Sequence, residues 1–120
     1  MPSDELYLQD IIGSCNDAER FLLGIEKEEF LQNELLQNSV LLKLIVIGEA
    51  AARISNELRE QYDEIPWKAI IGLRNIAVHA YFSIVWEIVW NTVTNDLGSL
   101  REQAQNILES DFPKFRLRQK

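Results

Sequence analysis

Apolar side chains recur at every third or fourth position along most of this 120-residue chain, and few folds are compatible with that period. Such spacing gathers apolar residues on one face of an α-helix. Glycine and proline occur only 5 and 3 times, and no Asn-Gly or Asp-Gly pair indicates a β-hairpin. The sequence therefore predicts an all-α protein, an up-down bundle of four main helices that forms a single domain over residues 1–120.

Residues that favour helix starts divide the chain into segments. Ser3 is expected to cap the first helix, and Pro66 suits the first turn of the third main helix. The start of the second main helix is open, because it begins either near Asn33 or with Asn38 or Ser39 as its cap. Helices are expected over residues 4–24 and 27–33, and then from residue 33 or 39 to residue 58. A further helix is expected to start at residue 66 and to end between residues 77 and 80, and the last one covers residues 83–109.

Small residues distinguish the inner face of the second main helix. Gly48, Ala51, Ala52 and Ser55 follow one another at helical spacing on that face. Because these side chains are short, a neighbouring helix is expected to approach closely there.

Aromatic and branched residues crowd the start of the last helix. Val85 and Ile88 are expected to be buried on its inner face. Trp86 and Trp90, four residues apart, form an aromatic ridge together with Phe82. This ridge is either part of the core or, in part, the surface of a dimer, because aromatic residues are enriched at the centres of interfaces.

The charge of the chain argues against avid, non-specific binding to nucleic acids. The net charge is −7 and the pI is about 4.7, whereas duplex-binding domains usually have a pI above about 9. Residues 1–65 carry 14 acidic and 5 basic side chains, which gives −9, and residues 66–120 carry 5 acidic and 7 basic ones, which gives +2. Residues 111–120 form a short basic tail, most simply a solvated chain end.

Metal, disulfide and membrane chemistry are not expected. Cys15 is the only cysteine and His79 the only histidine, so no intramolecular disulfide and no structural zinc site can form. No cofactor is expected. No apolar run reaches the roughly 18 residues of a membrane span, and the acidic start differs from a signal peptide. These features predict a reduced, cytoplasmic protein that does not bind membranes.

Arg74 is an unusual residue for the position that it occupies. Apolar residues precede and follow it at three and four positions, which places it on the apolar side of a helix. A guanidinium cannot be neutralised there and needs anionic or hydrogen-bonding partners. It converges with His79 if the helix ends near residues 77–80, with Tyr81 beside them. The pair makes either a structural hydrogen bond or an anion site, in which Arg74 binds a phosphoryl group and His79 moves a proton.

Glu49 is the second unusual residue, because it interrupts an apolar stretch one position after Gly48. One interpretation is a local ion pair with Arg53, four residues later, in the favourable orientation. The other is that Glu49 reaches Arg74 or His79 and orients it.

The residues from Arg74 to Tyr81, Arg-Asn-Ile-Ala-Val-His-Ala-Tyr, resemble the RX4HXY motif of HepT-like toxins, a branch of the HEPN superfamily of ribonucleases. Gly48-Glu49-Ala50 resembles the GEA element in the long helix of that family. Ile65-Pro66-Trp67 resembles the stretch that leads into its motif. The resemblance covers about residues 5–110, with the elements in the same order.

This resemblance implies a HEPN homodimer in which two motifs face each other and form a composite cleft. The activity it implies is metal-independent cleavage of RNA by an endoribonuclease that uses the RNA 2′-hydroxyl as nucleophile. Arg74 and His79 would be catalytic, with Asn75 and Glu49 in support. It further implies a type II toxin–antitoxin system, in which an MNT-type nucleotidyltransferase antitoxin transfers AMP to Tyr81.

Two other classes of function are compatible with the same residues. A non-catalytic module would bind a nucleotide or RNA without cutting it, or would dock the nucleotidyltransferase. A purely structural helical dimer would have Arg74 and His79 buried and paired within one subunit.

Overall fold

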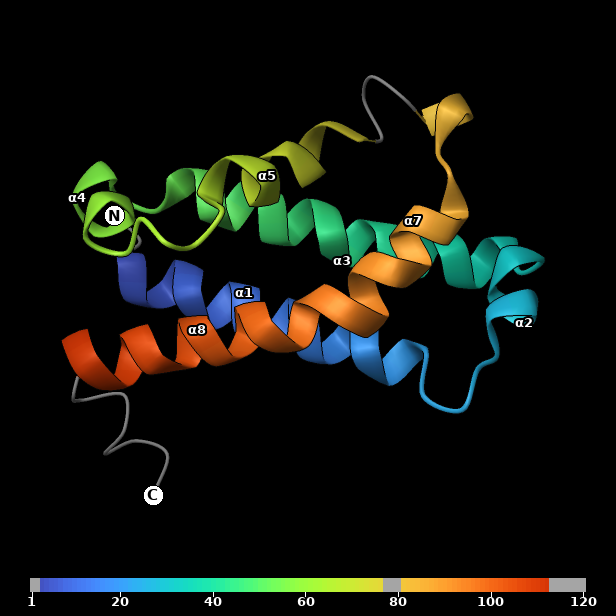
Figure 1. Ribbon diagram of the computed structural model, residues 1–120, viewed down its shortest axis with the longest axis horizontal. Coiled ribbons are helices and arrows are strands. Elements are labelled where there is room, and N and C mark those ends of the chain that lie inside the picture. Colours follow the sequence, from blue (N-terminus) through green and yellow to red (C-terminus); the bar gives the residue numbers. More distant parts are fainter. Residues whose placement is uncertain (1–2, 77–80, 113–120) are drawn as a thin grey trace.

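Four antiparallel helical segments form the bundle in the computed structural model, which describes residues 3–76 and 81–112 (Figure 1). The first packs against the second and the last, and the third lies on the second. No strand occurs in the described part of the chain, so the predicted all-α bundle is confirmed. The long helices are α1 (Asp4–Phe21), α3 (Glu34–Arg53) and α8 (Leu97–Asp111), and the short ones are α2 (Lys27–Leu31), α4 (Asn56–Gln61) and α5 (Trp67–Gly72). The prediction of an unbroken third helix from residue 66 to 77–80 is wrong, because α5 ends at Gly72 and a 3₁₀ turn follows it.

Helix α3 begins at the earlier of its two expected starts. The side chain of Asn33 accepts a hydrogen bond from the Leu36 amide at 3.0 Å, which satisfies one of the free N–H groups of the first turn. Asn38 and Ser39, the other expected caps, lie inside the helix. The prediction of a later start is therefore wrong.

The same helix ends at Arg53, before the predicted end at Leu58. Ser55 is the reason, because its side chain accepts from the Leu58 amide and caps α4. Its backbone N–H and hydroxyl also donate to the two carboxylate oxygens of Asp4, at 2.9 and 2.7 Å. This serine therefore starts a new helix and ties it to the beginning of α1.

Helix α3 is strongly apolar. Over 18 residues its mean hydropathy is 1.5, and by length and composition alone it could cross a membrane. The core helix of a bundle meets the same criteria, and α3 packs against α1, α5 and the turn after α5. Its apolar character is therefore weak evidence for a membrane span.

The last helical segment contains an internal irregularity. After a short 3₁₀ turn, η2 (Tyr81–Ser83), it begins with α7 (Trp86–Asn91), three residues later than predicted, and reaches α8 through a π-helical turn, η3 (Thr92–Asp96). The wider π turn disturbs the regular backbone hydrogen bonds. The hydroxyls of Thr92 and Thr94 donate to carbonyls four residues earlier, at 2.9 and 2.8 Å, and such bonds often accompany a bend in a helix.

The aromatic ridge is divided between the core and the surface. Phe30 of α2 is fully buried between Trp86 and Trp90, with ring centroids 6.2 and 5.6 Å apart. Phe82, by contrast, is 100% exposed. The two tryptophans therefore close the end of the core where α2 meets α7.

Val85 and Ile88 are exposed, and the prediction that they are buried is wrong for the single chain. Val85 precedes the first residue of α7, and Ile88 lies about 100° around the helix from the buried Val89. An apolar period in a sequence does not distinguish a core position from a position on an interface.

Candidate active site around Arg74

Gly48 allows the segment that carries Arg74 to lie directly against α3. A Cβ atom at Gly48 would be 2.6 Å from the Arg74 backbone nitrogen and 3.0 Å from the Ile70 carbonyl oxygen. The predicted close approach at the small face of α3 is confirmed. The element that approaches is α5 together with the 3₁₀ turn that follows it, η1 (Leu73–Asn75).

Arg74 lies in the middle of η1, where the chain tightens after the end of α5 at Gly72. This turn brings the arginine to the end of α3 that carries Glu49. The expected helix end at residues 77–80 and the catalytic candidate His79 lie outside the described residues.

The carboxylate of Glu49 is shared by two arginines. Its Oε1 accepts from Arg53 Nε at 3.0 Å, and its Oε2 accepts from Arg74 Nη1 at 3.5 Å. The structure therefore contains both the local pair with Arg53 and the longer-range contact with Arg74, which the sequence analysis treated as alternatives.

The guanidinium of Arg74 remains open to solvent. Its side chain is 41% exposed and that of Glu49 is 44% exposed, so the pair is worth at most about 1 kcal/mol. A guanidinium has several N–H donors in a planar fork, and among the described residues it contacts the side chain of Glu49 through one of these nitrogens. This exposure disagrees with a purely structural role, which would require a buried arginine.

Tyr81 is anchored to the same helix, about three turns from Glu49. Its hydroxyl donates to Asn38 Oδ1 at 2.9 Å, and its ring packs edge-to-face on Phe82 with centroids 5.5 Å apart. Asn38 is a residue that the sequence analysis missed, because it was considered only as a cap. The available signal was its distance of eleven positions from Glu49, which places both on one face of α3.

The outer face of α3 between these two anchors is apolar. Leu42 and Val46 lie there and are 57% and 36% exposed. Further exposed apolar side chains lie beyond Asn38 and around η2 and α7. We call the stripe on α3 formed by Leu35, Leu42 and Val46 the apolar face; Phe82, Val85 and Ile88 are exposed as well.

The remaining polar candidates differ in what they can contribute. Asn75 is exposed beside Arg74 in η1. Cys15 is buried in the core, and burial raises the pKa of its thiol to about 12, so it is not a nucleophile at neutral pH. Within residues 3–76 and 81–112, no three His, Cys, Asp or Glu side chains are grouped to hold a metal ion.

These features define a class of small, all-helical proteins. In this class an arginine, a histidine and a tyrosine follow one another in a short motif, and the exposed arginine, here Arg74, contacts a glutamate of the long helix, here Glu49. Residues 11–107 match the family described as ribonuclease HepT-like. The chain belongs to the HepT-like ribonuclease family.

Several curated proteins are similar over almost their whole length. A Methanocaldococcus jannaschii protein with a provisional RNase name is 36% identical over 82% of this chain and 91% of its own length. A Thermococcus cleftensis protein named probable ribonuclease HepT is 34% identical over 84% and 92%. A Caldanaerobacter subterraneus protein, also with a provisional RNase name, is 31% identical over 92% and 99%. No solved structure matches this chain.

Proposed function

We propose that this protein is the toxin of a type II toxin–antitoxin system and acts in the cytoplasm as a metal-independent endoribonuclease. One observation carries the proposal: Arg74 is held by Glu49 at the start of the motif, while much of its guanidinium stays open to an anion. Membership of a ribonuclease family and the names of the relatives support RNA as that anion.

The proposed cleavage of the RNA strand needs no cofactor. The RNA 2′-oxygen forms a bond to the adjacent phosphorus, and the bond from phosphorus to the 5′-oxygen breaks, which leaves a 2′,3′-cyclic phosphate and a 5′-hydroxyl. His79 removes the proton from the 2′-hydroxyl or gives one to the 5′-oxygen. Arg74 stabilises the negative charge that develops on the pentacoordinate phosphorus. Asn75 hydrogen-bonds the phosphate or orients His79.

A homodimer supplies the second proton-transfer group that each reaction needs. Each chain has one histidine, and a twofold interface brings two identical motifs together. The apolar face fits this role, because it flanks both Arg74 and Tyr81, and exposed apolar patches mark sites of association. A second copy of this chain therefore covers the apolar face and completes the cleft.

Cleavage of RNA in the presence of EDTA tests the proposed function. We expect wild-type protein to cut RNA without added metal and His79→Ala to be slower by roughly two to four orders of magnitude, because it lacks the proton-transfer group. The products are expected to carry 2′,3′-cyclic phosphate and 5′-hydroxyl ends. Sedimentation equilibrium of the same sample is expected to give twice the 13.9 kDa chain mass.

Different failures of this test have different meanings. RNA that binds without any product would support the non-catalytic module instead. Activity lost in EDTA and restored by a divalent cation would contradict metal independence. Full activity in a folded His79→Ala variant would contradict the assignment of His79.

The proposed antitoxin is an MNT-type nucleotidyltransferase that transfers AMP to Tyr81. The Tyr81 oxygen bonds to the α-phosphorus of ATP while pyrophosphate leaves and the phenolic proton is released. Tyr81 is 37% exposed, so its hydroxyl is within reach of a second protein. The added phosphate would block the cleft by its bulk and would repel the RNA backbone.

Intact-mass measurement after co-expression with the nucleotidyltransferase tests this modification. We expect one or more AMP units on the wild-type chain and none on Tyr81→Phe. Tyr7→Phe is the matched control, because Tyr7 lies in α1, and it should be modified like wild type. An unchanged mass with an active transferase, or AMP on Tyr81→Phe, would contradict the proposal.

A further inference from the structure

Lys68 differs from the other positively charged side chains of the described chain. Within residues 3–76 and 81–112, six of the eight lysines and arginines are paired with a carboxylate: Arg20, Lys27, Lys43, Arg53, Arg74 and Arg101. Arg59 donates a hydrogen bond to the side chain of Asn56. Lys68 is exposed and forms neither a hydrogen bond nor an ion pair with any described residue. Its charge is therefore free to bind an anion.

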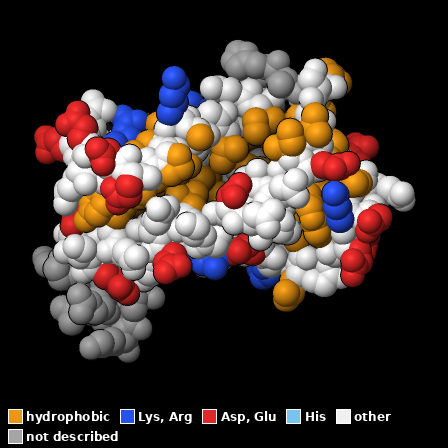
Figure 2. All heavy atoms as spheres, viewed as in Figure 1, with side chains coloured by type: hydrophobic (Ala, Val, Ile, Leu, Met, Phe, Trp, Pro, Cys, Tyr) orange, Lys and Arg blue, Asp and Glu red, His pale blue; other side chains and the backbone are white. Residues whose placement is uncertain are grey.

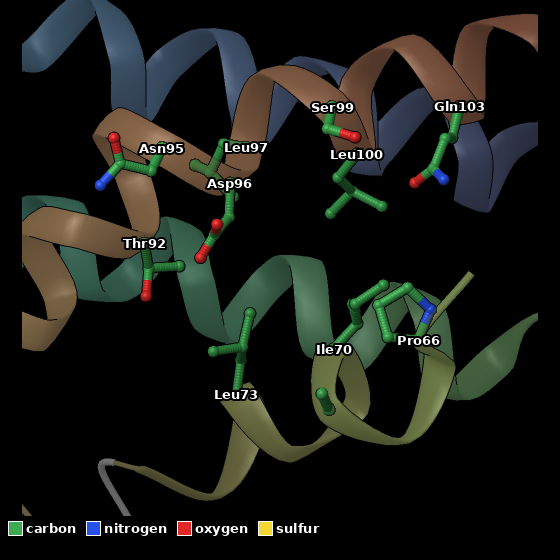
Figure 3. Close-up of a pocket in the computed structure, with 11 residues that line it drawn as sticks. Pro66, Ile70, Leu73, Thr92, Asn95, Asp96, Leu97, Ser99, Leu100 and Gln103 are labelled. Atoms are coloured by element: carbon green, nitrogen blue, oxygen red, sulfur yellow. The ribbon is translucent and has the colours of Figure 1, made fainter. Parts of the chain in front are cut away.

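Two sides of the segment that carries Lys68 and Arg74 face other helices. A groove of about 370 Å³ separates α5 and η1 from η3 and α8, and Ile70 and Leu73 point into it (Figure 3). Apolar side chains lie along this hollow (Figure 2). Another side rests on α3, where the backbone of Arg74 meets Gly48. The remaining side of the segment faces solvent.

The solvent side of this segment carries Lys68, Gly72 and Asn75, which follow one another at helical spacing and are all exposed. A Cβ atom at Gly72 would have no neighbour within 4 Å, so the surface between Lys68 and Asn75 is open. Because an α-helix rises 1.5 Å per residue, Lys68 and Arg74 are about 9 Å apart along the axis. A strand that continues from Arg74 along α5 therefore passes within reach of the lysine.

The surface around Arg74 keeps a positive charge although the chain as a whole is acidic. Glu49 carries one negative charge and is paired with two arginines, Arg53 and Arg74. These three side chains together keep one positive charge, and Lys68 adds a second one. A single strand of RNA carries one negative charge per nucleotide, so two cations along its path can bind two of its phosphates.

This positive surface ends at Lys68. On the side away from Arg74, Lys68 lines a shallow hollow together with Arg59 and two carboxylates, Glu60 and Asp63. The guanidinium of Arg59 is engaged with a side chain of α4, and the carboxylates repel a phosphate. Contacts with an anionic strand are thus expected to extend from Arg74 to Lys68 and no further.

We propose that Lys68 binds an RNA phosphate that neighbours the one at Arg74. The inference rests on the proposed ribonuclease function, which supplies the RNA strand. Lys68 touches no reacting atom, so it is a binding residue that helps to place the bond to be cut at Arg74. Its loss should therefore reduce the affinity for RNA strands and leave the rate of the chemical step unchanged.

The affinity for single-stranded RNA with 2′-O-methyl riboses, which lacks the proposed nucleophile, tests the inference at several salt concentrations. Lys68→Ala is expected to bind roughly fivefold more weakly at low salt and to lower the slope of log K against log salt by about 0.7, because one phosphate contact is lost. Lys68→Arg keeps the charge and should bind as wild type does. Lys27→Ala is the matched control, because Lys27 is an exposed lysine of α2 that is paired with Glu87, and it should change neither quantity.

A second pair of variants tests the path between Lys68 and Asn75. Gly72→Asp places a carboxylate in the open space of that surface, and it should weaken binding of the same RNA at least as much as Lys68→Ala does. Gly72→Asn introduces a side chain of nearly the same size without the charge, so it should bind more tightly than Gly72→Asp. Equal affinities of these two variants would contradict a path for RNA across Gly72.

Cleavage of substrates of two lengths separates binding of the strand from catalysis. A dinucleoside monophosphate contains the scissile phosphate alone, so Lys68→Ala should cut it as fast as wild type. With a longer strand, kcat/KM should fall roughly fivefold in Lys68→Ala while kcat is unchanged. Equal losses on both substrates would overturn the role of Lys68.

The inference and the proposed function can fail separately. Salt slopes that are the same for Lys68→Ala and Lys27→Ala, in a protein that cuts RNA, would overturn the phosphate site and leave the ribonuclease. Methylated RNA that binds through Lys68 to a protein that cuts no RNA would keep the phosphate site and remove the ribonuclease. An absence of any binding or cleavage of RNA would overturn both.

Discussion

Arg74→Ala is expected to lower the rate of RNA cleavage by roughly two to three orders of magnitude, the usual effect of removing a group that stabilises charge in a transition state. The loss should appear mainly in kcat, because Arg74 acts on the charge that develops in the transition state. Arg74→Lys keeps the charge but lacks the planar fork, so most of the loss should remain. Single-turnover cleavage kinetics measure both effects.

Arg53→Ala is the matched control for this prediction. It removes the other arginine on Glu49 and leaves the contact of Glu49 with Arg74 intact. Both pairs are half exposed, so each variant should lose less than about 1 kcal/mol of unfolding free energy. The assignment of Arg74 fails if its two variants cut RNA as fast as Arg53→Ala does.

Gly48→Ala is expected to damage both stability and cleavage. The added methyl group would meet the backbone of Ile70 and Arg74, which cannot turn aside as a flexible side chain can. We expect a loss of about 1–3 kcal/mol in unfolding free energy, as in other overpacked cores. A shift of η1 by about 1 Å should also slow cleavage by roughly 100-fold. Urea unfolding and the cleavage assay measure the two effects.

Gly13→Ala is the matched control, because Gly13 lies within α1 and a Cβ atom there would have no neighbour within 4 Å. Alanine favours a helix over glycine by about 1 kcal/mol, so this variant should be slightly more stable and equally active. If Gly48→Ala behaves like Gly13→Ala, the close contact between α3 and η1 is not what positions Arg74.

The helices could largely be predicted because they depend on local sequence. The apolar period defined the bundle, and Asn33 is a helix cap because an oxygen two or three residues before free N–H groups can serve them without any distant contact. The same preference made Asn38 and Ser39 plausible caps. Only the packing of η2 against α3 gives Asn38 its actual partner, Tyr81, 43 positions away.

The site could be predicted in part. The pair of Glu49 with Arg53 follows from their spacing on one helix, whereas the contact of Glu49 with Arg74 depends on how two helices pack. That contact was expected as one of two alternatives because each residue interrupts an apolar face. The π turn and the groove beside it gave no recognised signal, since neither changes the apolar period.

The hydrogen bond between Tyr81 and Asn38 has a chemical consequence for any modification of that tyrosine. A phenol that has become an ester has no hydrogen left to donate, so the Asn38 oxygen would lose its partner at the moment of attachment. Any group esterified to the Tyr81 oxygen would thus also remove the hydrogen bond that connects η2 to α3. Removal of the group would allow the Tyr81 hydroxyl to donate to Asn38 again. The position of η2 relative to α3 would thus depend on whether Tyr81 is modified.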